Sequence, residues 1–208
     1  YIGFYERFIY WCLVFRFMKK WYFFIIVLIV GFIFSEDALN FVVLHRIKSL
    51  DLFFISLGNF WVDIVLLLLA IFFLFFKKNR IKWILSILFS LFFSLFLVFL
   101  LKNLFRIPRP LVEAIIVETG YAFPSGHATG SFSVIPILFK SYGKIKYLFF
   151  ILAILVSFSR VYVGVHSLTD VLVGALIGFL IGKLFVYLEE KHNLFKLIVM
   201  FFKKNVNR

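Results

Sequence analysis

The sequence predicts an all-α membrane protein, a polytopic bundle of about six transmembrane helices preceded by an N-terminal interfacial helix. Of its 208 residues, 64% are hydrophobic, and the mean hydropathy of +1.07 lies far above that of soluble globular domains. Because a bilayer core of about 30 Å requires about 20 apolar residues per helix, this length accommodates about six spans with short connections. Residues 1–208 are therefore expected to form a single integral membrane domain.

The apolar segments that predict these spans follow one another with short polar connections. Residues 1–17 mix aromatic and charged side chains, which is typical of a helix lying in the membrane interface. Residues 35–58 are predicted to form an amphipathic segment outside the bilayer core. The six predicted spans are residues 18–34, 59–76, 83–101, 125–139, 146–160 and 169–188.

Basic residues cluster between alternate spans, which predicts how the chain crosses the membrane. Residues 19–20, 77–82, 140–146 and the tail 191–208 carry these clusters and fall on one side. Because positively charged loops remain in the cytoplasm, both termini are expected to be cytoplasmic. The residues between the remaining spans, which include all the distinctive polar motifs, would then lie on the periplasmic side.

The remaining composition narrows the class of protein further. The net charge of +13 does not predict nucleic-acid binding, because the basic residues are interspersed with apolar runs. Cys12 is the only cysteine, which excludes an internal disulfide and a cysteine-rich metal site. Gly174, Gly178 and Gly182 form a stripe on the last span, which predicts close helix packing within the chain, with dimerisation as the alternative. No feature indicates an obligatory protein partner.

Cationic side chains gather after the third span. Lys102, Arg106 and Arg109 recur at i, i+4 and i+7, so a helical continuation of the span would align them on one face. Interfacial anchors are the alternative interpretation, but the charge bias depletes cations from this side of the membrane. The cluster therefore favours an anion site, in which the planar guanidinium of arginine matches phosphate oxygens.

A first histidine lies on the same side, in the sequence Pro-Ser-Gly-His at 124–127 before the fourth span. Ser125 can cap that helix, and Gly126 permits close approach of the backbone to an anion. His127 at the helix start is then a candidate acid or base. For this tetrapeptide alone, a capped helix with an incidental histidine is the alternative.

The third polar cluster lies between the last two spans and contains Ser159, Arg160, His166 and Asp170. If the last helix begins near His166, the spacing of four residues places the Asp170 carboxylate within reach of the imidazole. It would then orient His166 as a nucleophile and stabilise the imidazolium. The stretch from Ser167 to Asp170 also fits a helix-capping box, and the two roles of Asp170 are compatible.

Together the three clusters resemble the type 2 phosphatidic acid phosphatase superfamily, whose signatures are K-x6-R-P, P-S-G-H and S-R-x5-H-x3-D. Each signature is present without substitution, at residues 102–110, 124–127 and 159–170. The resemblance implies a membrane lipid phosphatase that hydrolyses a phosphomonoester or pyrophosphate through a phosphohistidine intermediate.

The same resemblance implies a role for each matching residue. His166 would attack phosphorus, Asp170 would orient His166, and His127 would protonate the leaving oxygen and later activate water. The residues implied in binding the phosphoryl oxygens are Lys102, Arg109, Ser125, Gly126 and Arg160. Arg106 lies outside the signatures, and a headgroup contact is inferred from its position alone. No metal or other cofactor is expected, because cations replace a metal clamp and no carboxylate cluster is present to hold one.

The signatures specify only the phosphoryl group, so the identity of the lipid stays open. The expected non-cytoplasmic site and the small size of the chain point to bacterial envelope lipids, namely lipid A 1-phosphate, undecaprenyl pyrophosphate and phosphatidylglycerol phosphate, and hence to the inner membrane of a bacterium. Residues 35–58 are candidates for contact with the headgroup. Asp63, an acid within the second span, is either a functional residue or the partner of a nearby cation. The alternative functions are a lipid phosphotransferase with the same site and a non-enzymatic lipid carrier, which would leave His166 and Asp170 without a reason for their positions.

Overall fold

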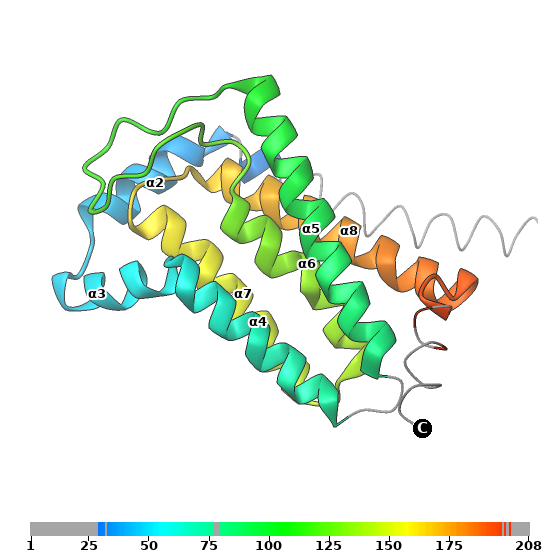
Figure 1. The fold of residues 1–208 in the computed structure, drawn as a ribbon. Coiled ribbons are helices and arrows are strands. Elements are labelled where there is room, and N and C mark those ends of the chain that lie inside the picture. The colour runs from blue at the N-terminus through cyan, green and yellow to red at the C-terminus, as the bar shows by residue number, and fades with distance from the viewer. Residues whose placement is uncertain (1–28, 32, 77–79, 197, 199, 201–208) are drawn as a thin grey trace, which may run out of the picture.

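The computed structural model describes residues 29–31, 33–76, 80–196, 198 and 200. The regular secondary structure of this part of the chain consists of helices, which form the bundle shown in Figure 1. Its helices are α2 (Ser35–Leu44), α3 (Lys48–Leu57), α4 (Phe60–Phe75), α5 (Arg80–Phe105), α6 (Gly126–Ser141), α7 (Ile145–Tyr162) and α8 (Leu168–His192). The predicted all-α fold class is confirmed.

Three of these helices, α5, α7 and α8, are long and apolar enough to cross a membrane. Helices α3 and α4 reach that length only as a pair, which is bent by 59° at the break between them. Helix α6 has 16 residues, fewer than the about 20 that a straight span requires. The interfacial helix expected at 1–17 and most of the first expected span, 18–34, lie outside the described residues, so the count of six spans stays a prediction.

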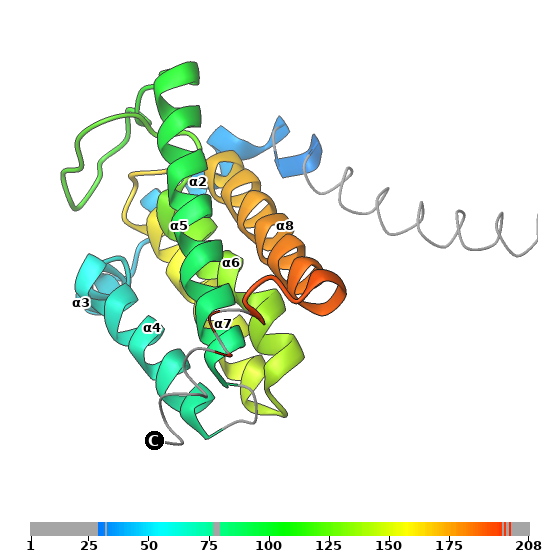
Figure 2. The same ribbon diagram turned by 45° about the vertical axis from the view of Figure 1, so that its right-hand side comes forward.

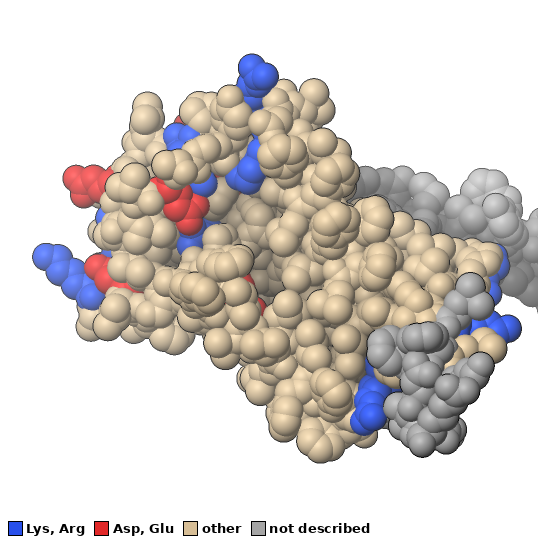
Figure 3. Space-filling view, viewed as in Figure 1, with Lys and Arg blue, Asp and Glu red and all other residues tan. Residues whose placement is uncertain are grey.

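The surface has the character of a protein embedded in lipid. Figure 3 shows charged side chains gathered toward the ends of the visible face, with a broad uncharged surface between them. Large apolar side chains are exposed along the described helices, with exposed fractions of 60% for Val65, 62% for Phe92 and 62% for Phe99. Because a soluble monomer rarely exposes so large an apolar surface, and because helices satisfy their own backbone polar groups in lipid, the chain is an integral membrane protein.

Helix α6 lies inside the bundle and packs against α5, α7 and α8, as Figures 1 and 2 show from two directions. Its contact with α8 is close because the glycine stripe of α8 lies on the α6 backbone. A Cβ atom added at Gly178 would overlap the carbonyl oxygen of Thr129, and one added at Gly174 would lie 2.6 Å from that of Ser125. The expected packing of the stripe within the chain is therefore confirmed.

The direction of each helix brings the polar motifs to one end of the bundle. Helices α5 and α7 run toward this end and α6 and α8 run away from it, so residues 102–127 and 159–170 meet there (Figure 1). Residues 35–58 form α2 and α3, which pack beside the same end. The Tyr162 hydroxyl at the end of α7 lies 2.9 Å from both the Ile47 carbonyl and the Asp51 carboxylate.

We expect Gly178→Ala to destabilise the bundle, because the added methyl group would overlap the backbone of α6. Overpacking of this kind costs about 1–3 kcal/mol, which lowers the Tm of a chain of this size by several degrees. Thermal unfolding of the detergent-purified protein measures the effect. Gly143→Ala is the matched control, because a Cβ atom at Gly143 meets nothing within 4 Å. Equal Tm values for the two variants would contradict the packing described.

Candidate active site

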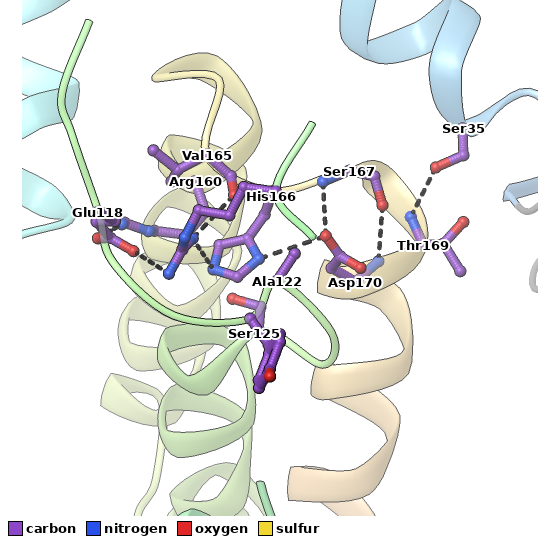
Figure 4. A network of polar contacts seen from close by, with 12 residues as sticks. Ser35, Glu118, Ala122, Ser125, Arg160, Val165, His166, Ser167, Thr169 and Asp170 are labelled. Carbon is purple, nitrogen blue, oxygen red and sulfur yellow. Dashed lines mark hydrogen bonds and ion pairs between the residues drawn. The ribbon is translucent and has the colours of Figure 1, made fainter. Parts of the chain in front are cut away.

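His166 and Asp170 lie at the junction of α7 and α8. Ser167 is the N-cap of α8, where its hydroxyl accepts from the Asp170 amide at 3.2 Å and its own amide donates to the Asp170 carboxylate at 2.9 Å. The same carboxylate oxygen lies 3.4 Å from Nδ1 of His166. Figure 4 shows the Asp170 carboxylate linked to both the His166 ring and the Ser167 amide. The capping box and the carboxylate–imidazole pair are thus both present, as the sequence suggested.

The imidazole of His166 is held out of solvent, since only 2% of the residue is exposed. Burial lowers the pKa of His166 from 6.5 to about 4, Asp170 opposes this shift, and the charges of Arg109 and Lys102 add to it. Nη1 of Arg109 lies 3.3 Å from Nε2 of His166. With its Nδ1 hydrogen directed at Asp170, the neutral ring keeps the lone pair on Nε2, on the side of the cations.

The cations of the first polar cluster do not lie on one helix, so the expectation that they share a helix face is wrong. Lys102 and Arg109 were expected to share a helix face with Arg106, but α5 ends at Phe105 and Arg106 has a φ of +51°. The proline at 108 explains the break, because it disfavours helix in the residue before it and cannot donate a backbone hydrogen bond. Arg106 is exposed and bonded to its own helix end, so its headgroup contact stays a prediction.

Lys102 and Arg109 instead stabilise the loop that follows. The Lys102 ammonium donates to the carbonyl oxygens of Tyr121 and Ala122, the latter at 3.1 Å. Arg109 lies in the non-helical segment that follows α5, and its Nη1 donates to the Val165 carbonyl at 2.9 Å. Both cations therefore connect the 106–125 loop to the site, Lys102 from α5 and Arg109 toward the turn before α8.

A residue that sequence analysis missed, Glu118, pairs with two of the predicted phosphate-binding arginines. One carboxylate oxygen lies 2.9 Å from Nη2 of Arg109, and the other pairs with Nη2 of Arg160. Arg160 is fully buried and also donates through Nη1 to the Gly58 carbonyl at 2.8 Å. Carboxylate and phosphate oxygens suit guanidinium groups in the same way, so Glu118 uses the donors that a phosphate would need. The only sequence signal was that Glu113 and Glu118 are the acids of this loop.

The Pro-Ser-Gly-His stretch lies against the start of α8. The Ser125 amide donates to the Asp170 carbonyl at 3.0 Å. Ser125 is the N-cap of α6 as expected, but its hydroxyl makes no capping bond there. The Oγ atom is buried and has no hydrogen-bond partner among the described residues. Gly126 follows as the first residue of α6, where the free amides of a helix start face the site.

His127 lies in the first turn of α6, with Nε2 3.5 Å from the carboxylate of Asp63 on α4. The charges of Lys102 and Arg109 act on this imidazole as they act on His166. The two histidines therefore belong to one electrostatic site. The sequence allowed two interpretations of Asp63, a functional residue or the partner of a nearby cation. In the structure its carboxylate faces the imidazole of His127.

An apolar cavity of about 300 Å³ lies between α4, α5, α6 and α7, next to His127. Among the residues that line it, only Asp63, His127 and Ser131 have polar side chains. The lining extends along the helices to Ala70 on α4 and Phe149 on α7. A polar group attached to an apolar chain suits such a cavity, with the polar end at His127.

Comparison with known proteins identifies the family. A family model described as the PAP2 superfamily matches residues 83–194, which make up more than half of the chain and contain all three polar clusters. The chain belongs to the PAP2 superfamily. The arrangement of the described helices agrees: a solved transmembrane PAP2 type phosphatidylglycerolphosphate phosphatase from Bacillus subtilis matches it with a TM-score of 0.67 and 27% identity, covering 84% of this chain and 96% of that one.

Several curated relatives of this PAP2 chain are named as lipid phosphatases. Phosphatidylglycerophosphatase B of Bacillus subtilis (strain 168) is 34% identical over 109 residues, which cover 46% of this chain and 53% of that protein. Lipid A 4'-phosphatase of Porphyromonas gingivalis is 30% identical over 155 residues, 66% of this chain and 65% of the relative. The chain thus spans between about half and two thirds of these relatives.

We expect Glu118→Gln to bind orthovanadate more tightly than the wild-type protein, because the arginines no longer carry a competing negative charge. The expected gain is about tenfold in Kd, or about 1.4 kcal/mol, and isothermal titration calorimetry in detergent measures it. Glu113→Gln is the matched control, since Glu113 is exposed in the same loop. An affinity that is unchanged or lower in Glu118→Gln would show that Glu118 does not compete for the anion.

We expect His166 to stay neutral down to about pH 4, because burial lowers its pKa to about that value. A lowered pKa means that the unprotonated ring prevails at every pH above it, including neutral pH. NMR titration of protein labelled at its four histidines follows each ring, and the signal missing from His166→Ala assigns this one. Protonation of that signal near the ordinary value of 6.5 would contradict the buried, neutral state.

Proposed function

We propose that this PAP2 protein hydrolyses a phosphomonoester or pyrophosphate of a bacterial envelope lipid through a phosphohistidine formed at His166. The observation that carries the proposal is the state of that imidazole: Nδ1 faces a carboxylate, Nε2 faces a guanidinium, and burial keeps the ring neutral. A neutral imidazole oriented in this way is a nucleophile. The adjacent guanidinium supplies the charge that attracts a phosphate to it.

The proposed reaction has two steps at phosphorus. In the first, Nε2 of His166 attacks phosphorus, the bond to the lipid oxygen breaks, and His127 gives its proton to that oxygen. In the second, His127 takes a proton from water, the resulting hydroxide attacks phosphorus, and the bond to Nε2 breaks to release phosphate. Asp170 stabilises the positive charge that the His166 ring carries while phosphorus is attached.

Positive side chains and helix amides are proposed to hold the transferred group. Arg109 and Arg160 would exchange Glu118 for phosphoryl oxygens, Lys102 would add a point charge, and the buried Ser125 hydroxyl would donate its unused hydrogen. Gly126 would contribute its amide at the start of α6. We propose that no metal takes part, because these donors compensate the phosphate charge, and within the described residues no group of three or more His, Cys, Asp or Glu side chains could hold one.

The cavity beside His127 supports a lipid as the leaving group. A chain attached to the leaving oxygen would extend from His127 into the apolar lining while the phosphoryl group stays among the cations. The proposed substrates are the envelope lipids that combine these parts: phosphatidylglycerol phosphate, lipid A phosphate and undecaprenyl pyrophosphate. All three of these lipid types appear in the names of relatives.

We further propose that the site faces the periplasm and that both termini are cytoplasmic. The basic clusters at residues 80–82 and 140–146 follow helix ends opposite the site, because α4 and α6 run away from it and α5 and α7 return. The positive-inside rule then places that opposite end in the cytoplasm. The only partners that the proposal requires are the bilayer and the lipid substrate.

We expect His166→Ala to release no measurable phosphate from any of the three lipids, because the nucleophile is gone. The detergent-purified wild-type protein, assayed with a chelator present, should release phosphate and carry an acid-labile phosphoryl group after an alkaline quench. An unchanged Tm in the variant controls for folding. Near-normal turnover by folded His166→Ala would contradict the mechanism. Failure of the wild-type protein on every lipid would favour a phosphotransferase, which added acceptor lipids would reveal, or a lipid carrier.

A further inference from the structure

Asp63 and His127 face each other at one end of the apolar cavity. The carboxylate of Asp63 lies 3.5 Å from Nε2 of His127, and the side chains are 29% and 23% exposed. Among the described residues that line the cavity, Asp63 is the only acid and His127 the only base. A carboxylate enclosed to this degree is rare in a membrane helix, and its partner is normally the reason for its position.

The start of α4 is anchored, so the position of Asp63 is defined. Asn59 caps the helix by accepting from the Trp61 amide at 2.9 Å. The preceding residue, Gly58, accepts from Arg160 through its carbonyl oxygen, and a Cβ atom added at Gly58 would overlap that guanidinium. Asp63 lies one turn after these contacts. The same arginine that binds Glu118 in the candidate site therefore fixes the helix start from which Asp63 reaches His127.

We infer that Asp63 is a positioning residue for the proton donor His127, forming a second carboxylate–imidazole pair opposite that of His166 and Asp170. The inference rests on the proposed function. With Nε2 held by Asp63, the His127 ring presents Nδ1 to the leaving oxygen. The negative charge also favours the imidazolium form, which a donor must have at the outset and which burial, foremost, and the nearby charges of Arg109 and Lys102 disfavour.

In the first phosphoryl transfer, the two carboxylates stabilise positive charge on different rings, Asp170 on the nucleophile His166 and Asp63 on the proton donor His127. Asp170 stabilises positive charge that appears on His166 as phosphorus becomes attached, whereas Asp63 stabilises positive charge that His127 holds beforehand. As the P–O bond breaks, the proton leaves Nδ1 of His127 for the leaving oxygen, and the lipid departs as an alcohol. The ring then keeps its Nε2 hydrogen on Asp63, and it regains a proton at Nδ1 from the attacking water. Asp63 itself exchanges no proton.

The 3.5 Å separation is compatible with this role. Catalytic hydrogen bonds are commonly long in the absence of a ligand and shorten when substrate binds. A purely structural pair between α4 and α6 would hold the helices together equally well for every substrate. If Asp63 instead positions a proton donor, the loss of activity on replacing Asp63 depends on whether the leaving group needs a proton.

The test compares two phosphate monoesters that differ only in this need: one of a long-chain alkanol, and one of a nitrophenol carrying the same alkyl chain. An alkoxide requires a proton to leave, whereas a nitrophenolate leaves as the anion. We expect Asp63→Asn to lower kcat/KM on the alkyl phosphate by about 10- to 100-fold, a part of the roughly 100- to 10,000-fold that a general acid contributes. On the nitrophenyl phosphate the expected loss is below about threefold.

Three controls distinguish a loss of folding, a loss of the negative charge and a nonspecific effect of replacing an acid. Turnover of the nitrophenyl phosphate by Asp63→Asn shows that the variant folds, and Asp63→Glu, which keeps the charge, should retain more alkyl phosphatase activity than Asp63→Asn. Glu190→Gln, at an exposed acid near the end of α8 that lies away from the site, should leave both activities unchanged. Equal losses on both substrates, or loss of folding in Asp63→Asn and Asp63→Glu alike, would overturn the inference. A wild-type protein inactive on both substrates would contradict the proposed function itself.

Discussion

Asp170 joins three parts of the chain at a buried point, and the geometry of the site depends on its hydrogen bonds. Its carboxylate accepts from the Ser167 amide and pairs with Nδ1 of His166, while its amide donates to the Ser167 hydroxyl. Its carbonyl accepts from the Ser125 amide at the start of α6. Because Asp170 is only 4% exposed, losing any of these bonds would leave a polar group unpaired in an apolar interior. The orientation of His166 therefore follows from the way in which α8 begins.

Close packing of α8 on α6 is what brings the Asp170 carbonyl to the Ser125 amide. Gly174 lies one helical turn after Asp170, and a side chain there would meet the Ser125 carbonyl at 2.6 Å. The next glycine, Gly178, lies on the Thr129 carbonyl in the same manner. A larger residue at these positions would move α8 away from α6 and separate the two motifs. The small residues that help helices associate in lipid thus also determine the distance between polar groups at the helix ends.

The sequence predicted those features whose cause is local. The pairing of His166 with Asp170 follows from a spacing of four residues at the start of a helix, and the spans follow from runs of apolar residues. Both predictions require only that the local segment is helical. The route of Arg109 was not predictable from spacing, because the i, i+4, i+7 argument assumes a helix that the following proline ends. Glu118 lies in a loop without periodicity, so nothing in the sequence indicated its partners. Asp63 was recognised as an acid in a span, but its partner depends on the packing of α4 against α6.

The buried cations of the site need a negatively charged partner. Burial lowers the pKa of Arg109, Arg160 is fully buried, and Lys102 lies nearby, so in an apolar interior these groups need a negative partner. Glu118 meets part of that need from within the chain, and the dianion of a phosphate monoester would meet more of it. On this argument the binding free energy comes mainly from exchanging one anion for another among fixed cations, and little of it depends on the lipid. Under the proposed function, the phosphoryl group would be recognised by charge and the apolar cavity would accept the lipid chain.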